Sequence, residues 1–172
     1  IFWMFLGSFK TNAEIYANPW GFPETFNYQN FITAWTEYNI GTSVFNSLIV
    51  TTLGAILCLV LAIPTAYAIE RVRFKGSNFL FTLYISAMMI PMVLAWIPLF
   101  FLLAQLNMLD SLIGLAIVYA LSQLPFTIFV LTSFISTIPK SLEESAAIDG
   151  MSPYGILWKI VTPLTTSGII TV

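Results

Sequence analysis

Histidine is absent from the sequence, and cysteine occurs once, at Cys58 inside a long apolar run. The chain therefore lacks the side chain that most often acts as a general acid or base near neutral pH. One cysteine without histidine provides neither a zinc ligand set nor a disulfide pair. We interpret Cys58 as a small buried apolar residue and expect no histidine-based or zinc-dependent catalysis.

Charge is also scarce. Charged residues make up 8% of the sequence, against about 25% in an ordinary soluble domain. Hydrophobic residues make up 58%, and the mean hydropathy is +0.89. The net charge is only -2, and no basic patch favours nucleic acid. This composition predicts a membrane protein.

Three long apolar segments predict spanning helices at residues 44–69, 78–104 and 112–138. Each exceeds the roughly 20 residues that cross a bilayer. We expect Pro64 to kink the first and Pro125 to break the third. Between and around these spans we predict the end of a spanning helix at 1–8, an external loop at 9–43, a cytoplasmic turn at 70–77, an external turn at 105–111, a cytoplasmic loop at 139–160 and the start of a spanning helix at 161–172. Within the external loop, residues 27–35 are predicted either as a short interfacial helix or as part of a simple linking loop.

The basic residues predict the orientation of these spans. Five of the six lie in the turn at 70–77 and the loop at 139–160, which an even number of spans separates. Lys10 alone lies on the other side. Because loops rich in lysine and arginine remain in the cytoplasm, the turn and the loop that together carry these five residues are predicted to be cytoplasmic.

Polar side chains inside the spans are few. Asn46, Ser122 and Gln123 are candidates for a solute path, and helix–helix contact is the alternative role for them. No Asp, Glu, Lys or Arg lies within a span. Carriers driven by protons or sodium commonly use ionisable groups at that depth, so we expect the energy for transport to come from elsewhere.

The segment at 139–160 is an island of charge that predicts two short helices joined by a tight turn. Ser141 and Glu144 have the spacing of a capping box. Gly150 falls where a left-handed residue ends a helix, and Ser152 followed by Pro153 starts the next one. On spacing alone, the segment is either a coupling element or a plain connection on the membrane surface.

The order of residues in this segment carries a family resemblance. Glu144, Ser145 and Ala146, followed by Gly150 and later by Ile160 and Pro163, resemble the EAA loop of the membrane subunits of ATP-binding-cassette (ABC) importers. The sequence departs from that pattern at Ser145 and Thr162, where the family has Ala and Leu. The segments NSLIVTTLGAILCLVLAIPTAYAIERVRFKG and MIPMVLAWIPLFFLLAQLNMLDSLIGL are similar to helices of the carbohydrate-uptake permeases.

The resemblance implies an all-α, polytopic transmembrane helix bundle of the type I ABC importer permease fold, incomplete at both ends. The chain would be an internal part of a longer permease in the bacterial inner membrane. It would act with a second permease, a cytoplasmic ATPase dimer and an extracytoplasmic solute-binding protein. ATP and magnesium would bind to the ATPase, because the chain has no G-x-x-x-x-G-K-[ST] phosphate loop. The implied ATPase-coupling residues are Glu143, Glu144, Ser145, Ala146, Ala147, Asp149 and Gly150.

The resemblance implies import of a sugar or oligosaccharide. Import of another solute, such as a polyamine or glycerol phosphate, is the first alternative. A passive channel would need a polar stripe along a pore, and the spans show none. A membrane-embedded enzyme would need a nucleophile–base pair or metal ligands, which these apolar spans do not supply.

Overall fold

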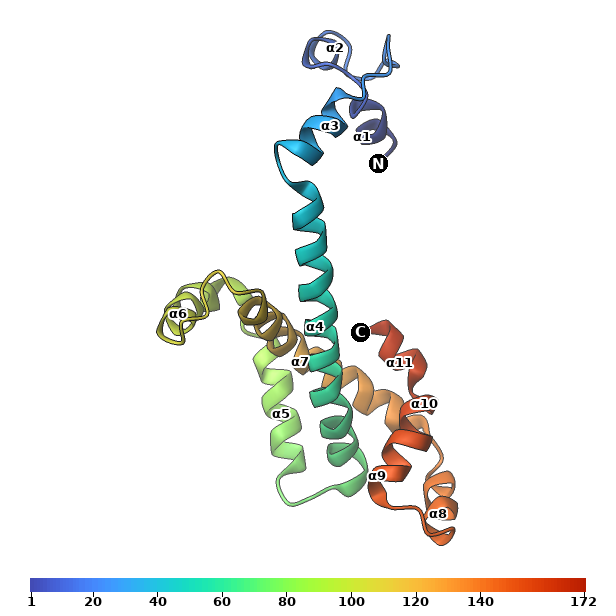
Figure 1. Cartoon of the computed structure of the whole chain (residues 1–172). Coiled ribbons are helices and arrows are strands. Elements are labelled where there is room, and N and C mark those ends of the chain that lie inside the picture. Colours follow the sequence, from blue (N-terminus) through green and yellow to red (C-terminus); the bar gives the residue numbers. More distant parts are fainter. The chain divides into compact units, whose positions relative to one another are not determined.

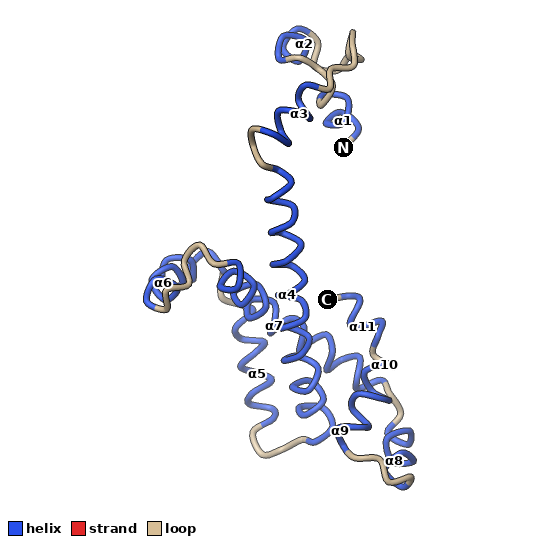
Figure 2. Tube along the Cα trace, viewed as in Figure 1, coloured by secondary structure: helices blue, strands red, loops and turns tan.

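The computed structural model describes all 172 residues, and they form helices joined by short loops without a β-strand (Figure 2). The chain divides into two compact units, Ile1–Leu48 and Ile49–Val172. The observed architecture confirms the expected all-α class.

The first unit contains three short helices and the beginning of a long one. Phe9 is its aromatic centre, with ring centroids 5.2 to 5.7 Å from those of four other aromatic residues. Lys10 is buried, and its Nζ donates a hydrogen bond of 2.8 Å to the Asn18 carbonyl. The helices are α1 (Phe2–Gly7), α2 (Asn12–Ala17), α3 (Gln29–Thr36) and the first residues of α4 (Ile40–Tyr67). Of the two alternatives for residues 27–35, helix α3 agrees with the short helix, and its place at the membrane interface stays a prediction.

A complete capping box starts α2. The Glu14 backbone N–H donates to the Thr11 hydroxyl, and the Glu14 carboxylate accepts from the Thr11 N–H at 2.7 Å and from its hydroxyl at 2.8 Å. The Glu24 N–H donates to the same carboxylate at 3.0 Å. These donors, the Thr11 N–H foremost, lower the pKa of Glu14, because they stabilise its ionised form.

The cap of α2 should therefore loosen in acid. A lowered folded-state pKa means that the stabilisation is fully present above the ordinary pKa of a glutamate and is lost as pH falls through the lowered value. Titration of the Thr11 and Glu24 amide resonances in detergent micelles should show one shared acidic transition. In Glu14→Gln that transition should be absent from both amides. An unchanged titration in the variant would show that Glu14 does not cause it.

The second unit is built on two long apolar helices (Figure 1). Helix α4 continues without a break into the π-helical turn η1 (Ala68–Val72), so the helix runs over 33 residues, about 50 Å at 1.5 Å per residue. Helix α7 (Leu112–Thr137) has 26 residues. Both are long and apolar enough to cross a membrane.

Two prolines lie inside the long helices, and the kink expected at Pro64 stays a prediction. Pro64 lies inside α4 and Pro125 lies inside α7, and both helices continue past them, so the predicted break at Pro125 is wrong. Packed helices tolerate proline in an apolar environment when neighbouring groups satisfy the freed carbonyl. Buried residues flank both prolines, including Ile63 beside the first and Thr127 close to the second.

The segment predicted as one span at 78–104 is two helices. Helices α5 (Ser77–Met88) and α6 (Met92–Gln105) meet at an angle of 100°. Pro91 precedes α6 with extended backbone angles, φ -60° and ψ 123°. Because proline disfavours helical geometry in the residue before it, the chain leaves α5 at this point. The pair forms either one broken span or a re-entrant segment.

The remaining helices follow α7 closely. They are α8 (Lys140–Ile148), α9 (Pro153–Ile156), the π-helical turn η2 (Leu157–Val161), α10 (Thr162–Leu164) and α11 (Thr166–Thr171). A buried apolar cluster joins this segment to the lower parts of α4 and α7 in Figure 1. Its members are Ala62, Ile63, Ala66, Ile69, Ile128, Leu131, Ile135, Ile138, Ala146, Ile156, Leu157 and Val161.

Candidate functional site

The segment from α8 to η2 has the predicted helix–turn–helix form. Gly150 has a φ of +82°, in the left-handed region, as predicted for the residue that ends the first helix. The Ser152 hydroxyl accepts a hydrogen bond of 3.2 Å from the Gly155 N–H, and Pro153 opens α9. These two features confirm the turn and the second helix start.

The predicted capping box at Ser141 and Glu144 is wrong. Pro139 is the N-cap residue of α8, and no side chain caps this helix start. The Leu142 N–H already donates to the Pro139 carbonyl, so Ser141 lies within the first turn. The helix therefore begins earlier than predicted, because proline is compatible with the extended geometry before a helix.

Helix α8 has two chemically different faces. Glu143 and Ala146, three residues apart, face inward: the Glu143 side chain is 12% exposed and Ala146 is 7% exposed. The outward residues from the predicted coupling set are Glu144, Ser145, Ala147, Asp149 and Gly150. Ile148, which was not in the predicted set, lies between them in the sequence and is 87% exposed. The outer face thus combines small residues, carboxylates and one fully accessible apolar side chain.

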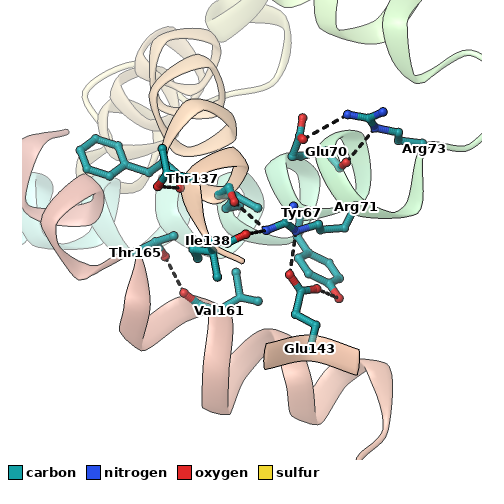
Figure 3. Close-up of polar contacts among 11 residues, drawn as sticks. Tyr67, Glu70, Arg71, Arg73, Thr137, Ile138, Glu143, Val161 and Thr165 are labelled. Carbon is teal, nitrogen blue, oxygen red and sulfur yellow. Dashed lines mark hydrogen bonds and ion pairs between the residues drawn. The ribbon is translucent and has the colours of Figure 1, made fainter. Parts of the chain in front are cut away.

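Glu143 does not offer its carboxylate outward, contrary to the expectation that it would face a partner. Its Oε1 lies 2.7 Å from Arg71 Nε, and the Tyr67 hydroxyl donates to its Oε2 at 3.0 Å (Figure 3). The contact with Nε has the distance of an ion pair without the alignment of a directed hydrogen bond. The reason is register: with α8 beginning at Lys140, position 143 faces the end of α4.

Arg71 completes this inner cluster. Its Nη2 donates hydrogen bonds to the carbonyls of Ile135, at 2.8 Å, and Ile138, at 2.6 Å. Ile135 belongs to the last turn of α7 and Ile138 is the residue that follows the helix, so both carbonyls lie where a helix end leaves unpaired acceptors and favours a cation. Figure 3 shows the guanidinium between α7 and the Glu143 carboxylate. We define Tyr67, Arg71 and Glu143 as the inner clamp.

The second unit also contains a pocket of about 400 Å³. Ser122 and Gln123, two of the three candidates for a solute path, lie on its wall, whereas Asn46 does not line it. The wall is largely apolar, with polar groups from few residues. Other lining residues are Thr51, Gly54, Ala55, Cys58, Leu59, Tyr119, Thr127, Ile169 and Val172. A concave, mostly apolar site with a few polar groups is typical of small-molecule binding.

Replacing Gln123 by alanine should separate solute contact from helix packing. If Gln123 lies on the predicted solute path, its replacement should reduce transport without loss of stability. A residue that only joins helices should cost about 0.6 kcal/mol of stability, with little selective effect on transport. Uptake and thermal stability are the measurements, with Ser133→Ala, an exposed position on the same helix outside the pocket, as control. A purely structural effect would remove Gln123 from the path.

Comparison with known proteins identifies the family. The model of the family described as "binding-protein-dependent transport system inner membrane component" matches residues 54–172. The chain belongs to this family. It is accordingly a multi-pass protein of the bacterial inner membrane, with helices apolar enough to span it.

Several curated relatives of this inner membrane component are similar over almost the whole chain. The diacetylchitobiose uptake system permease protein NgcG of Streptomyces coelicolor is 33% identical, over 97% of this chain and 55% of the relative. DasC, a diacetylchitobiose uptake permease of the same organism, is 35% identical, over 98% and 62%. The melibiose/raffinose/stachyose import permease protein MelC of Bacillus subtilis is 33% identical, over 91% and 57%. The chain thus spans between 55% and 62% of the length of these relatives.

Proposed function

We propose that this inner membrane component is the membrane-spanning subunit of an ABC importer for a sugar or oligosaccharide, and that the α8–α9 segment couples it to a partner ATPase. The observation that carries the proposal is the outer face of α8. Small residues allow close approach to another surface, and Ile148, 87% exposed, supplies an apolar contact. Glu144 and Asp149 offer carboxylates for charge-assisted hydrogen bonds with a basic groove.

The relatives support the proposed substrate class, since their names refer to diacetylchitobiose, melibiose, raffinose and stachyose. The pocket of about 400 Å³ fits a small molecule. Partners in the proposed assembly are a second permease, two ATPase subunits that bind ATP and magnesium, and a solute-binding protein. The chemistry of hydrolysis would belong to the ATPase.

The test is purification of the complex and measurement of ATP hydrolysis with a solute panel. Diacetylchitobiose, melibiose and raffinose form the sugar arm, and a polyamine and glycerol phosphate form the second arm. We expect an ATPase to co-purify and at least one sugar to stimulate hydrolysis. Stimulation by the second arm alone would replace the sugar assignment, and the absence of any ATPase would refute the importer.

Glu144→Lys tests the coupling face itself. Reversing a carboxylate opposite a basic groove should weaken ATPase binding about tenfold or more, since like charges placed together cost several kcal/mol. Glu37→Lys is the matched control, because Glu37 is exposed and belongs to the predicted external side. Equal ATPase retention in the two variants would argue that α8 is a plain connection.

The proposed orientation has its own expected result. The inner clamp brings the turn after α4 and the start of α8 together, which agrees with their placement on one side. In a Cys58→Ala background, a cysteine at position 144 should react with an impermeant thiol reagent only in inverted vesicles. A cysteine at position 37 should react only in intact cells. Labelling of position 144 from outside would reverse the topology.

A further inference from the structure

Three elements that are distant in sequence meet at Arg71. The residue lies in η1, at the end of α4, and its side chain is 7% exposed. It donates to the carbonyl of Ile135, in the last turn of α7, and to that of Ile138, just after the helix, 64 and 67 positions along the chain. It also pairs with Glu143 on α8. Tyr67, one turn earlier on α4, donates to the other oxygen of the same carboxylate.

The backbone alone provides a weak mechanical connection between α7 and α8. Helix α7 ends at Thr137 and α8 begins at Lys140, so two residues with extended geometry, Ile138 and Pro139, form the link. Such a link fixes distance but leaves the direction of α8 to be set by its contacts. The inner clamp supplies a second, independent attachment on the buried face of α8.

We infer that Arg71 is a positioning residue that makes α8 one mechanical body with the cytoplasmic ends of α4 and α7. Force applied to the outer face of α8 then reaches both long helices through the Arg71–Glu143 pair, beside the Ile138–Pro139 link. The inference deepens the proposed function and rests on it, because the force is that of the partner ATPase.

The type of contact favours a role of Arg71 in transmitting force over a role in stability alone. Buried ion pairs are often no more stabilising than apolar residues of similar volume, so stability alone gives little reason for a charge here. The two hydrogen bonds that Arg71 donates to backbone carbonyls instead fix the direction of its guanidinium, and the Glu143 carboxylate lies against it at ion-pair distance. Arg71 contacts two carbonyls and one carboxylate at separations of 2.6 to 2.8 Å, which holds the end of α7 and the start of α8 in a single register.

The experiment replaces the ionic link by a covalent one. In a Cys58→Ala background, Arg71→Cys with Glu143→Cys removes both charges together, so neither is left buried without a partner. Because Cys58 lines the pocket, uptake per ATP of the Cys58→Ala complex itself is the reference. The purified complex is reconstituted in vesicles, and uptake of the most stimulating panel sugar is measured per ATP hydrolysed. The measurement is repeated after treatment with a short, flexible bifunctional thiol reagent.

The matched control is Glu70→Cys with Arg73→Cys. This pair is also ionic, at 3.2 Å, and lies on the same element, but the Arg73 side chain is 65% exposed and the pair reaches neither α7 nor α8. Neither loss of this pair nor its cross-linking should alter coupling.

For the clamp variant we expect the ATPase to remain bound and uptake per ATP to fall roughly 2- to 30-fold, the range found for mutations within coupling networks. Cross-linking positions 71 and 143 should restore it, whereas the control pair should respond to neither step.

Normal coupling before cross-linking overturns the inference. A cross-link that stops transport also overturns it, since the clamp would then have to open in each cycle. Loss of the ATPase from the clamp variant alone also overturns it, because the pair would then shape the docking face. Failure of the unmodified complex to contain an ATPase refutes the proposed function instead.

Discussion

Replacing Arg71 by alanine should lower the free energy of unfolding by about 3–5 kcal/mol, the cost of breaking a buried ion pair from one side. The Glu143 carboxylate, 12% exposed, would lose the cation that it pairs with. The carbonyls of Ile135 and Ile138 would lose their donor as well. The effect is large because all three groups depend on one guanidinium.

The measurement is thermal or denaturant unfolding in detergent, with Arg73→Ala as the matched control. Arg73 is two positions away and pairs with Glu70, but its side chain is 65% exposed, so its loss should cost about 0–1 kcal/mol. The double variant Arg71→Ala with Glu143→Ala should recover part of the lost stability. Similar small losses at positions 71 and 73 would contradict the buried clamp.

Replacing Gly150 by valine should uncouple ATP hydrolysis from uptake. The φ of +82° costs a residue with a Cβ about 1–2 kcal/mol, and a β-branched side chain suffers most. No atom lies within 4 Å of an added Cβ, so the cost comes from the backbone and not from a clash. If the turn changes its backbone angles to relieve this strain, α9 no longer keeps its place beside α8. Binding of the proposed ATPase should then weaken about tenfold.

Gly150→Asn is the matched control, because asparagine tolerates the left-handed region. It should retain most coupling, and Gly7→Val, at an open position without positive φ, should be silent. ATPase retention and uptake in vesicles are the measurements. Equal behaviour of Gly150→Val and Gly150→Asn would show that the left-handed turn is not needed for coupling.

The sequence allowed correct prediction of features whose cause is local. A glycine at a helix end and the Ser152–Pro153 pair identify the turn and the start of α9, because capping and φ preferences involve only neighbouring residues. Long uncharged runs likewise identified α4 and α7. Local rules failed at Ser141, where Pro139 starts the helix two residues earlier. A capping box with the same spacing exists at Thr11 and Glu14, where no proline competes.

Tertiary packing decided the features that were missed. Both prolines inside the long helices are accommodated, while Pro91 accompanies a 100° change of direction, and the sequence around each is similarly apolar. The inward position of Glu143 and Arg71 was also not predicted. The four-residue spacing of Tyr67 and Arg71 on one helix face could have indicated a shared buried contact. The positive-inside rule does not distinguish Arg71 from Arg73, because it uses only their charge. Only contact with α7 and α8 distinguishes them.

The long sequence separation of the clamp has a consequence for biosynthesis. The partners of Arg71 are 64 and 67 residues away, and a ribosome adding about 5–20 residues per second needs several seconds to reach them. During that interval the guanidinium would lack its partners on α7 and α8, and in the proposed orientation its charge would help to retain the emerging turn on the cytoplasmic side. When the end of α7 and then Glu143 emerge, the same charge is withdrawn into the protein. In the proposed orientation, one arginine would act first as a topogenic signal during insertion and afterwards as a structural contact.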